Sequence, residues 1–213
     1  MKPYEVCLEI AGPTAMWTRP DTGDAPVSYP APTYGAAQGI FEAVLWLQNA
    51  EVEPTKVEIC APLIYHQYTT NYGGPMRKAD QFKKGNNYQL IATVLINVCY
   101  RLYAQVRDHA PQEMELSVKA RRWRDCNGAH AYQDIFQGRL EKGRFFRTPC
   151  LGWQEFLPDY LGPFREETQI QEDLTFVLPS MLCEVFPGPK RAPRAPRFSQ
   201  NVQIKRGVLN YAT

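Results

Sequence analysis

The chain has 213 residues, of which 44% are hydrophobic, and its formal net charge is only +2. This length and composition predict a globular protein of one large domain, or of a domain with an appendage, and they exclude an intrinsically disordered chain. Because the net charge is nearly balanced, evidence for a nucleic-acid partner must come from local clusters of cations.

Cysteine usage and the length of the apolar runs indicate the cellular compartment that we expect for the protein. The six cysteines contain no CxxC pair, and no signal-like leader precedes the first apolar segment, so we expect reduced core cysteines in a cytoplasmic protein. No apolar run approaches the roughly 20 residues that span a bilayer, so no membrane partner is expected. The histidines, cysteines and acids show no metal-ligand spacing, and we expect neither a metal nor another cofactor.

The N-terminal part of the chain predicts two strands with a helix between them. Apolar and polar residues alternate over residues 4–10, which predicts the first strand. Residues 13–32 are rich in Pro, Gly and Asp and predict a long irregular loop. Thr33 can cap a helix that continues to about Gln48. Alternation over residues 57–61 then predicts the second strand.

A polar excursion follows over about residues 65–88. It contains a double glycine at residues 73–74 that permits a sharp turn, and it is too polar to belong to the core. Its cations are Arg77, Lys78, Lys83 and Lys84. We predict a basic β-hairpin inserted into the domain, and the alternative is a polar loop.

The strongest local signal is strict alternation between Tyr88 and Val106, where every even-numbered residue is apolar. Alternation with a period of two predicts a β-strand with one buried face. A polar, cationic sheet face can be solvated, can dock another subunit or can hold an RNA. The odd-numbered face carries Asn97, Arg101, Gln105 and Arg107.

A basic run with an aromatic residue inside it lies further along the chain. Arginine makes bidentate contacts to phosphate, and tryptophan can stack on a base. The run therefore predicts contact with a nucleic acid, and a solvated charged helix is the alternative. Its members are Lys119, Arg121, Arg122, Trp123 and Arg124.

The second predicted helix covers residues 129–142 and ends at Gly143, and residues 144–156 are predicted to form a strand. The element order is strand, helix, strand, strand, helix, strand, which is typical of ferredoxin-like and RNA-recognition (RRM-like) α+β folds. We predict one such domain over residues 1–157, with the hairpin inserted, and a C-terminal extension over residues 158–213.

Two segments carry a family resemblance. They are VSYPAPTYGAAQGIFEAVLW at residues 27–46 and GRFFRTPCLGWQEF at residues 143–156. Together with the TRP at residues 18–20, they resemble the CRISPR-associated Cas-five family, subtype I-C (Dvulg type), within the RAMP superfamily. The resemblance implies an RRM-like RAMP fold that binds the repeat-derived 5′ handle of CRISPR RNA in a type I-C Cascade-like antiviral complex. The implied partners are CRISPR RNA and the backbone and large subunits, and target DNA is reached only through the complex.

The resemblance also implies a metal-independent endoribonuclease that processes precursor CRISPR RNA with a Tyr, a Lys and a His. In this chain the family's Tyr position holds Leu45. The Lys-His pair falls on Ala131 and Tyr132, or on Ala129 and His130 after a two-residue shift. His130 and Tyr132 are therefore the candidates for proton transfer. Their alternatives are a surface or capping role for the histidine and core packing for the tyrosine.

Cations beside the second helix complete the candidate site. Lys142, Arg144 and Arg147 can hold the phosphates of a bound RNA. Three functions stay open at this point: a processing nuclease that also binds RNA, a cleavage-inactive structural subunit, and a generic RNA-binding module.

Overall fold

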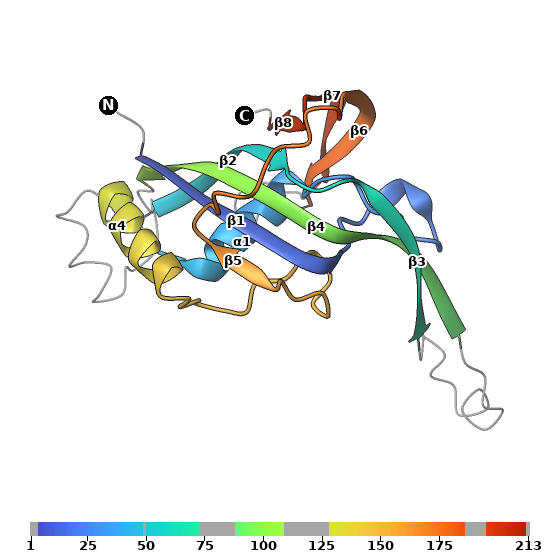
Figure 1. Ribbon diagram of the computed structural model, residues 1–213, viewed down its shortest axis with the longest axis horizontal. Helices are drawn as coiled ribbons and strands as arrows, with labels where there is room; N and C mark the ends of the chain where they lie inside the picture. Colours follow the sequence, from blue (N-terminus) through green and yellow to red (C-terminus); the bar gives the residue numbers. More distant parts are fainter. Residues whose placement is uncertain (1–3, 49, 73–87, 109–127, 186–194, 212–213) are drawn as a thin grey trace.

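The computed structural model describes residues 4–48, 50–72, 88–108, 128–185 and 195–211. Figure 1 shows an antiparallel sheet through the middle of the molecule, with α1 and α4 against one of its faces. None of the helices in these ranges is long and apolar enough to cross a membrane. The elements are β1 (Tyr4–Ala15), a 3-10 helix (Pro20–Thr22), α1 (Tyr34–Val44), β2 (Ala50–Ile59), β3 (Ile64–Tyr72), β4 (Tyr88–Asp108), α4 (Gly128–Glu141), β5 (Tyr160–Gly162), β6 (Phe176–Glu184), β7 (Arg197–Lys205) and β8 (Val208–Asn210).

The strand order identifies the fold class. Four strands lie side by side in the order β5-β1-β4-β2, and each neighbouring pair is antiparallel. α1 connects β1 to β2, and α4 connects β4 to β5, which gives the ferredoxin-like arrangement. Thr33 caps α1 as predicted, because its Oγ1 accepts a hydrogen bond from Ala36 N at 3.2 Å. The predicted α+β, ferredoxin-like class is confirmed.

The last strand of this arrangement does not lie where the sequence predicted it. Residues 144–156 form a loop, and β5 pairs with β1 instead. The loop contains Pro149, which lacks an N–H for a sheet ladder, and Gly152, whose φ of +96° is foreign to a strand. The strand predicted over residues 144–156 is therefore wrong.

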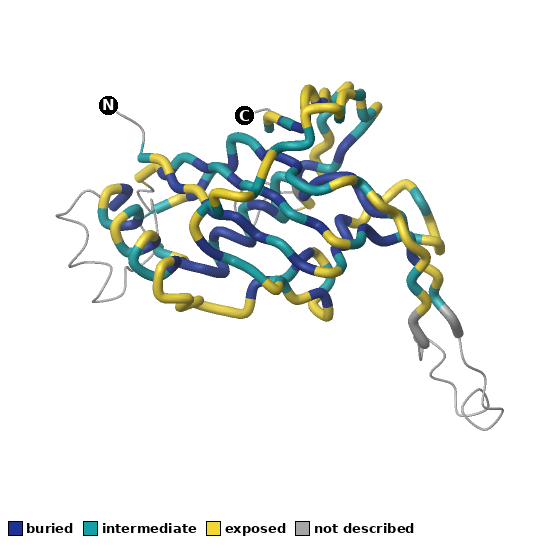
Figure 2. Tube along the Cα trace, in the orientation of Figure 1, coloured by how far each residue is buried: buried dark blue, intermediate teal, exposed yellow. Residues whose placement is uncertain are grey.

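The predicted alternation of β4 is confirmed. Tyr100, Leu102, Ala104 and Val106 are each at most 3% exposed. Leu102 lies directly opposite Leu8 of β1, so the apolar faces of the two strands share one side of the sheet. Figure 2 shows buried positions recurring along the central strands. This side forms the core under α1 and α4.

The opposite side of the sheet centre is covered by the chain itself. The segment over residues 163–174 crosses the sheet in Figure 1, and Arg101 Nη2 donates to the carbonyls of Arg165 (2.7 Å) and Thr168 (2.9 Å). Arg101 Nε also lies 3.2 Å from a carboxylate oxygen of Glu9, whose side chain is fully buried. The cationic sheet face that we expected to be open is therefore covered at Arg101, because the Arg101 guanidinium is bonded to this segment and to Glu9.

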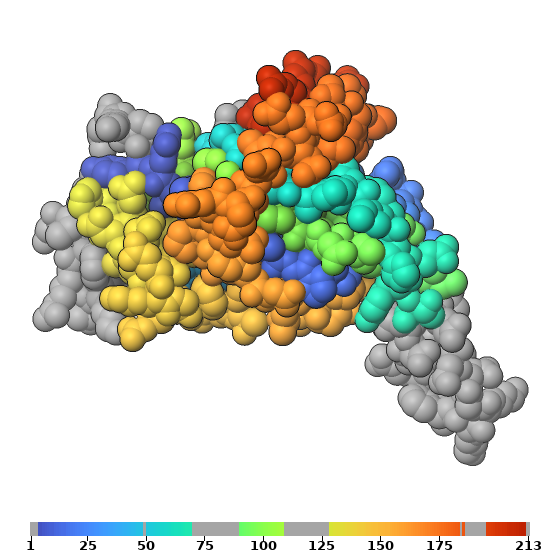
Figure 3. Space-filling model, viewed as in Figure 1, coloured from blue at the N-terminus to red at the C-terminus, as the bar shows by residue number. Residues whose placement is uncertain are grey.

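The inserted hairpin is confirmed for its two arms. β3 pairs with the first half of β4, from Ile64 opposite Ile96 to Tyr72 opposite Tyr88. Figures 1 and 3 show these arms extending away from the body of the molecule. The cations predicted for the hairpin (Arg77, Lys78, Lys83 and Lys84) and the basic run (Lys119, Arg121, Arg122, Trp123 and Arg124) lie outside the described residues.

The C-terminal residues extend the same sheet beyond β2. β8 pairs with β2, and Ile59 N donates to Gly207 O at 2.8 Å. β7 and β6 follow, and they form the lobe at the top of Figure 3. Tyr211 Oη donates to Pro32 O at 2.8 Å and ties the end of the chain to the segment before α1. The division of the chain after residue 157 stays a prediction.

Candidate nucleic-acid interface

The C-terminal end of α1 organises the surface that carries the predicted cations. The last carbonyls of a helix have no partner within the helix, and here α4 and the loop after it supply the donors. Phe146 N and Arg147 N donate to Ala43 O at 2.8 and 3.1 Å, and Arg139 Nη1 donates to Val44 O at 3.0 Å. The loop over residues 142–148 is thereby fixed against α1.

The end of α4 directs the chain into this loop. Gly143 has a φ of +60°, Gly143 N donates to Leu140 O at 3.2 Å, and Arg144 N donates to Arg139 O at 2.9 Å. This is the Schellman ending, for which glycine is the favoured residue, so the predicted stop at Gly143 is confirmed. Lys142 and Arg144 lie at the negative end of the helix dipole, which favours cations there.

The two helix ends and the loop present cations beside exposed aromatic rings. We call this set the basic–aromatic surface. The rings of Trp46 and Phe146 are stacked, with centroids 6.5 Å apart and an interplanar angle of 25°, and these residues are 46% and 59% exposed. The members of the surface are Trp46, Arg139, Lys142, Arg144, Phe145, Phe146 and Arg147.

The cations of this surface are available to a ligand to different degrees. Within the described part of the chain, Lys142 and Arg144 make no ion pair, and both residues are exposed. The Arg147 side chain is 60% exposed, and its nearest carboxylate oxygen, on Glu42, is 3.8 Å away. Phosphate groups can therefore reach at least three cations without breaking a buried salt bridge.

Two concave surfaces adjoin Arg147. Arg147, Thr148 and Pro149 line one hollow together with Gly39 and Ala43 of α1. The same three residues line a second hollow that continues to residues 157–161. Cations that alternate with stacked aromatic rings, next to hollows, are suited to single-stranded nucleic acid, because bases stack on the rings and phosphates pair with the cations.

His130 lies at the other end of α4. Its side chain is 57% exposed, Nδ1 lies 3.3 Å from Asp134 Oδ2, and its ring contacts Tyr4 edge-on at 5.5 Å. A rise of 1.5 Å per residue puts it about 16 Å along the helix axis from Glu141. The structure therefore does not bring His130 together with Lys142, Arg144 and Arg147.

Tyr132 is a core residue. It is 1% exposed, it stacks on Phe136, and its hydroxyl donates to Leu45 O at 2.8 Å. Burial raises the pKa of Tyr132 well above its ordinary value, so the hydroxyl stays protonated. Tyr132 is therefore not a usable proton-transfer group, and the core-packing alternative holds. Leu45 is also buried. Leu45 and Tyr132, which occupy two positions where the resemblance expects catalytic residues, therefore contact each other but provide no accessible acid or base.

Sequence reasoning missed the aromatic part of the surface. Phe145 and Phe146 lie between two of the predicted cations, Arg144 and Arg147, and this interleaving was a usable signal. The stacking of Trp46 on Phe146 could not be read from the sequence, because a hundred positions separate them and only the docking of the loop on α1 brings them together.

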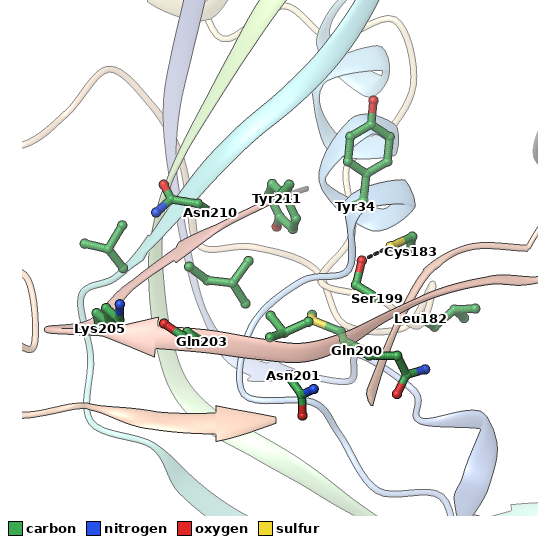
Figure 4. A pocket seen from close by; sticks show the side chains of 14 residues that line it. Tyr34, Leu182, Cys183, Ser199, Gln200, Asn201, Gln203, Lys205, Asn210 and Tyr211 are labelled. Atoms are coloured by element: carbon green, nitrogen blue, oxygen red, sulfur yellow. Dashed lines mark hydrogen bonds between the residues drawn. The ribbon is translucent and has the colours of Figure 1, made fainter. Parts of the chain in front are cut away.

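A separate cavity lies in the C-terminal lobe, next to the start of α1. It has a volume of about 310 Å³ and is lined by residues that include Tyr34, Cys183, Ser199 and Tyr211. Figure 4 shows these side chains and the contact of Cys183 Sγ with Ser199 Oγ at 2.8 Å. None of the predicted site residues lines it.

The antiparallel sheet with two helices on one face places the chain in the ferredoxin-like class of α+β proteins. The family model described as CRISPR-associated protein (Cas_Cas5), of the Cas5d type, matches residues 5–175. The chain therefore belongs to the Cas5d family of CRISPR-associated proteins.

Two relatives agree with this assignment. The chain is 28% identical over 159 residues to the CRISPR pre-crRNA endoribonuclease Cas5d of Thermus thermophilus, covering 73% of this chain and 62% of the relative. It is 27% identical over 164 residues to the protein of the same name from Mannheimia succiniciproducens, covering 70% of this chain and 68% of the relative. The chain thus spans less than two thirds of the Thermus protein.

The solved structures support the fold alone. A crystal structure of a CRISPR-associated protein matches with a TM-score of 0.69 at 17% identity, covering 100% of this chain and 94% of that one. A functionally uncharacterized protein from Streptococcus mutans also gives 0.69, at 18% identity, covering 98% and 92%.

Proposed function

We propose that this protein binds the repeat-derived 5′ handle of CRISPR RNA as a subunit of a type I-C Cascade-like surveillance complex. The observation that carries the proposal is the basic–aromatic surface, held on a chain that belongs to the Cas5d family. The complex would also contain backbone and large subunits, and target DNA would be met only through the assembled complex.

Binding would use two kinds of contact on this surface. Lys142, Arg144 and Arg147 would pair with consecutive phosphates, because the first two make no ion pair in the described part of the chain and the third is only loosely paired. An unstacked base would add to the stack of Trp46 and Phe146, whose rings already lie in nearly parallel planes.

Cleavage is the second candidate function, and it is favoured by the names of both relatives, which are called pre-crRNA endoribonucleases. Metal-independent cleavage needs a group that deprotonates the ribose 2′-hydroxyl and a cation over the phosphate. Leu45 and the buried Tyr132 cannot supply the first. Only His130 remains of the two proposed catalytic residues, with Asp134 placed to orient its imidazole. We therefore propose binding as the principal activity.

One experiment separates the two candidates. The purified chain is incubated with a cognate repeat RNA in excess chelator, which silences metal-dependent contaminating nucleases, and both a native gel and a denaturing gel are run. We expect a shifted complex and intact RNA, with the shift weakened in a Lys142→Gln, Arg144→Gln, Arg147→Gln variant. A single cut that leaves a cyclic phosphate, and that disappears in His130→Ala, would establish the nuclease instead. RNA that neither shifts nor is cut would overturn both candidates.

A further inference from the structure

Two cysteines face each other across the sheet where β2 ends. Ile59 pairs with Tyr100 of β4, and the next opposed pair is Cys60 and Cys99, with Cys60 N donating to Cys99 O at 2.8 Å. Opposed residues in antiparallel strands have Cα atoms about 4.5–5.5 Å apart. This lies inside the range of about 4.4–6.8 Å that disulfides span. Both thiols are free and partly exposed, and Cys60 Sγ donates to Glu58 O at 3.6 Å.

The surroundings of Cys99 favour its thiolate. Arg165 Nη2 lies 3.7 Å from Cys99 Sγ. Arg101 and Arg165 both pair with the carboxylate of Glu9, so two positive charges face one negative charge there. The neighbouring Cys60 thiol and Arg165 lower the pKa of Cys99, although burial and the Glu9 carboxylate, whose Oε1 lies 3.7 Å from Cys99 Sγ, oppose this. The pKa of Cys60 is raised. In the reduced pair Cys99 is the favoured nucleophile, since the thiolate is the reactive form, and Cys60 keeps its proton until Cys99 has reacted.

We propose that Cys60 and Cys99 are a thiol–disulfide couple, which a low-molecular-weight disulfide such as oxidised glutathione converts into a cross-strand disulfide. The Cys99 thiolate attacks one glutathione sulfur, the glutathione S–S bond breaks, and one glutathione thiolate leaves. Cys60 then loses its proton to that thiolate or to water and attacks Cys99 Sγ, displacing the second glutathione. Two protein thiols are oxidised and one glutathione disulfide is reduced to two thiols.

The position of the pair gives the oxidation a structural effect. The bond would close the chain over residues 60–99, which contains both arms of the inserted hairpin, and would fasten the arms at their root. The disulfide would also remove the contact between Cys99 Sγ and Arg165. Arg165 belongs to the segment over residues 163–174 that covers the sheet, and this segment is also bonded to the end of β2, where Gln171 N donates to Ile59 O at 2.9 Å. This proposal does not depend on RNA binding.

Thiol mapping of the full chain tests the couple. The folded protein is equilibrated in glutathione buffers of graded oxidation, free thiols are alkylated, and the digest is analysed by mass spectrometry. We expect a linked peptide pair containing Cys60 and Cys99, with both residues lost from the alkylated pool together. Cys7→Ser and Cys150→Ser are the matched controls, and they should leave this linkage unchanged.

Single variants test the order of attack. Cys60→Ser should leave Cys99 to accumulate a mixed disulfide with glutathione, whereas Cys99→Ser should leave Cys60 mostly alkylatable. The couple is refuted if both thiols of the wild-type chain stay alkylatable in every buffer while circular dichroism shows a folded protein. It is also refuted if only other cysteines become linked or glutathionylated.

Discussion

Tyr132 occupies a position where the family resemblance expects a catalytic residue, but it is part of the core. Its hydroxyl satisfies the carbonyl of Leu45 at the end of α1, and its ring stacks on Phe136 within the core. A buried hydroxyl with a partner of this kind stabilises the fold and has no access to an RNA. The residue therefore helps to position the basic–aromatic surface, and its contribution can be measured as a change in the free energy of unfolding.

We expect Tyr132→Phe to lower the free energy of unfolding by about 1–3 kcal/mol, because the buried Leu45 carbonyl loses its partner. Urea denaturation measures the loss. The control is Tyr160→Phe, whose hydroxyl donates to Pro163 O at an exposed position and should cost less, because water replaces the bond. Equal losses for the two variants would contradict the core role of Tyr132.

The stacked pair on the surface should contribute affinity and not stability. Trp46→Ala or Phe146→Ala is expected to weaken binding of a repeat RNA by about 5- to 150-fold, since a stacked base contributes about 1–3 kcal/mol. Fluorescence anisotropy with labelled RNA gives the dissociation constants. Phe198→Ala, at a similarly exposed ring on β7, should leave them unchanged. An equal effect of Phe198→Ala would argue against the proposed surface.

At the scale of elements, the loop over residues 144–156 depends on one close approach. A Cβ on Gly152 would lie 1.8 Å from Met16 O, and its φ is +96°. Gly152→Ala should therefore destabilise the fold by about 2 kcal/mol or more. Gly39→Ala, in α1 with nothing within 4 Å of the new Cβ, should stabilise it by about 0.5–1 kcal/mol. Thermal unfolding of both variants checks the contrast, and a tolerated Gly152→Ala would contradict it.

The same elements show what a sequence can predict. The alternation of β4 has a period that only a half-buried strand explains, and the caps at Thr33 and Gly143 follow from local hydrogen bonding. The loop after α4 could not be predicted, because its backbone bonds to α1, far away in sequence. The cover over Arg101 was missed for the same reason, since nothing near Arg101 in the sequence indicates that residues 165–168 return to it.

For the whole molecule, Glu9 joins distant parts of the chain. Its carboxylate accepts from Arg165 Nε at 2.6 Å, from Thr168 Oγ1 at 2.8 Å and from Arg101 Nε at 3.2 Å. Burial alone would raise the pKa of Glu9, but these hydrogen bonds lower it below its ordinary value of 4.5. A lowered pKa in the folded state means that the stabilisation is complete above 4.5 and is lost as the pH falls toward the folded-state value.

We therefore expect the free energy of unfolding to fall below pH 4.5, and Glu9→Gln to flatten that dependence while costing about 3 kcal/mol at neutral pH. Urea denaturation across the acidic range measures both effects. Glu172→Gln, which removes an exposed partner of Arg206, should change the neutral stability by less than about 1 kcal/mol. An unchanged acid profile in Glu9→Gln would contradict the assignment.

Charge at the scale of the molecule sets the expected salt dependence. With a net charge of only +2, attraction to RNA must come from local cations. Replacing Lys142, Arg144 and Arg147 by Gln should reduce the slope of log K against log salt by about 2, because each phosphate contact on a single strand contributes about 0.7. Anisotropy titrations at several salt concentrations give the slope, and an unchanged slope would place the RNA elsewhere.

The central position of β4 also determines how the chain must fold. β1, β2 and β3 all pair with this one strand, and Tyr4 finds its partner at Val106. Folding slows as contacting residues lie further apart in sequence. Until β4 has left the ribosome, the edges of β1 and β2 that pair with it have no hydrogen-bond partner, so the nascent chain is exposed to aggregation during that interval.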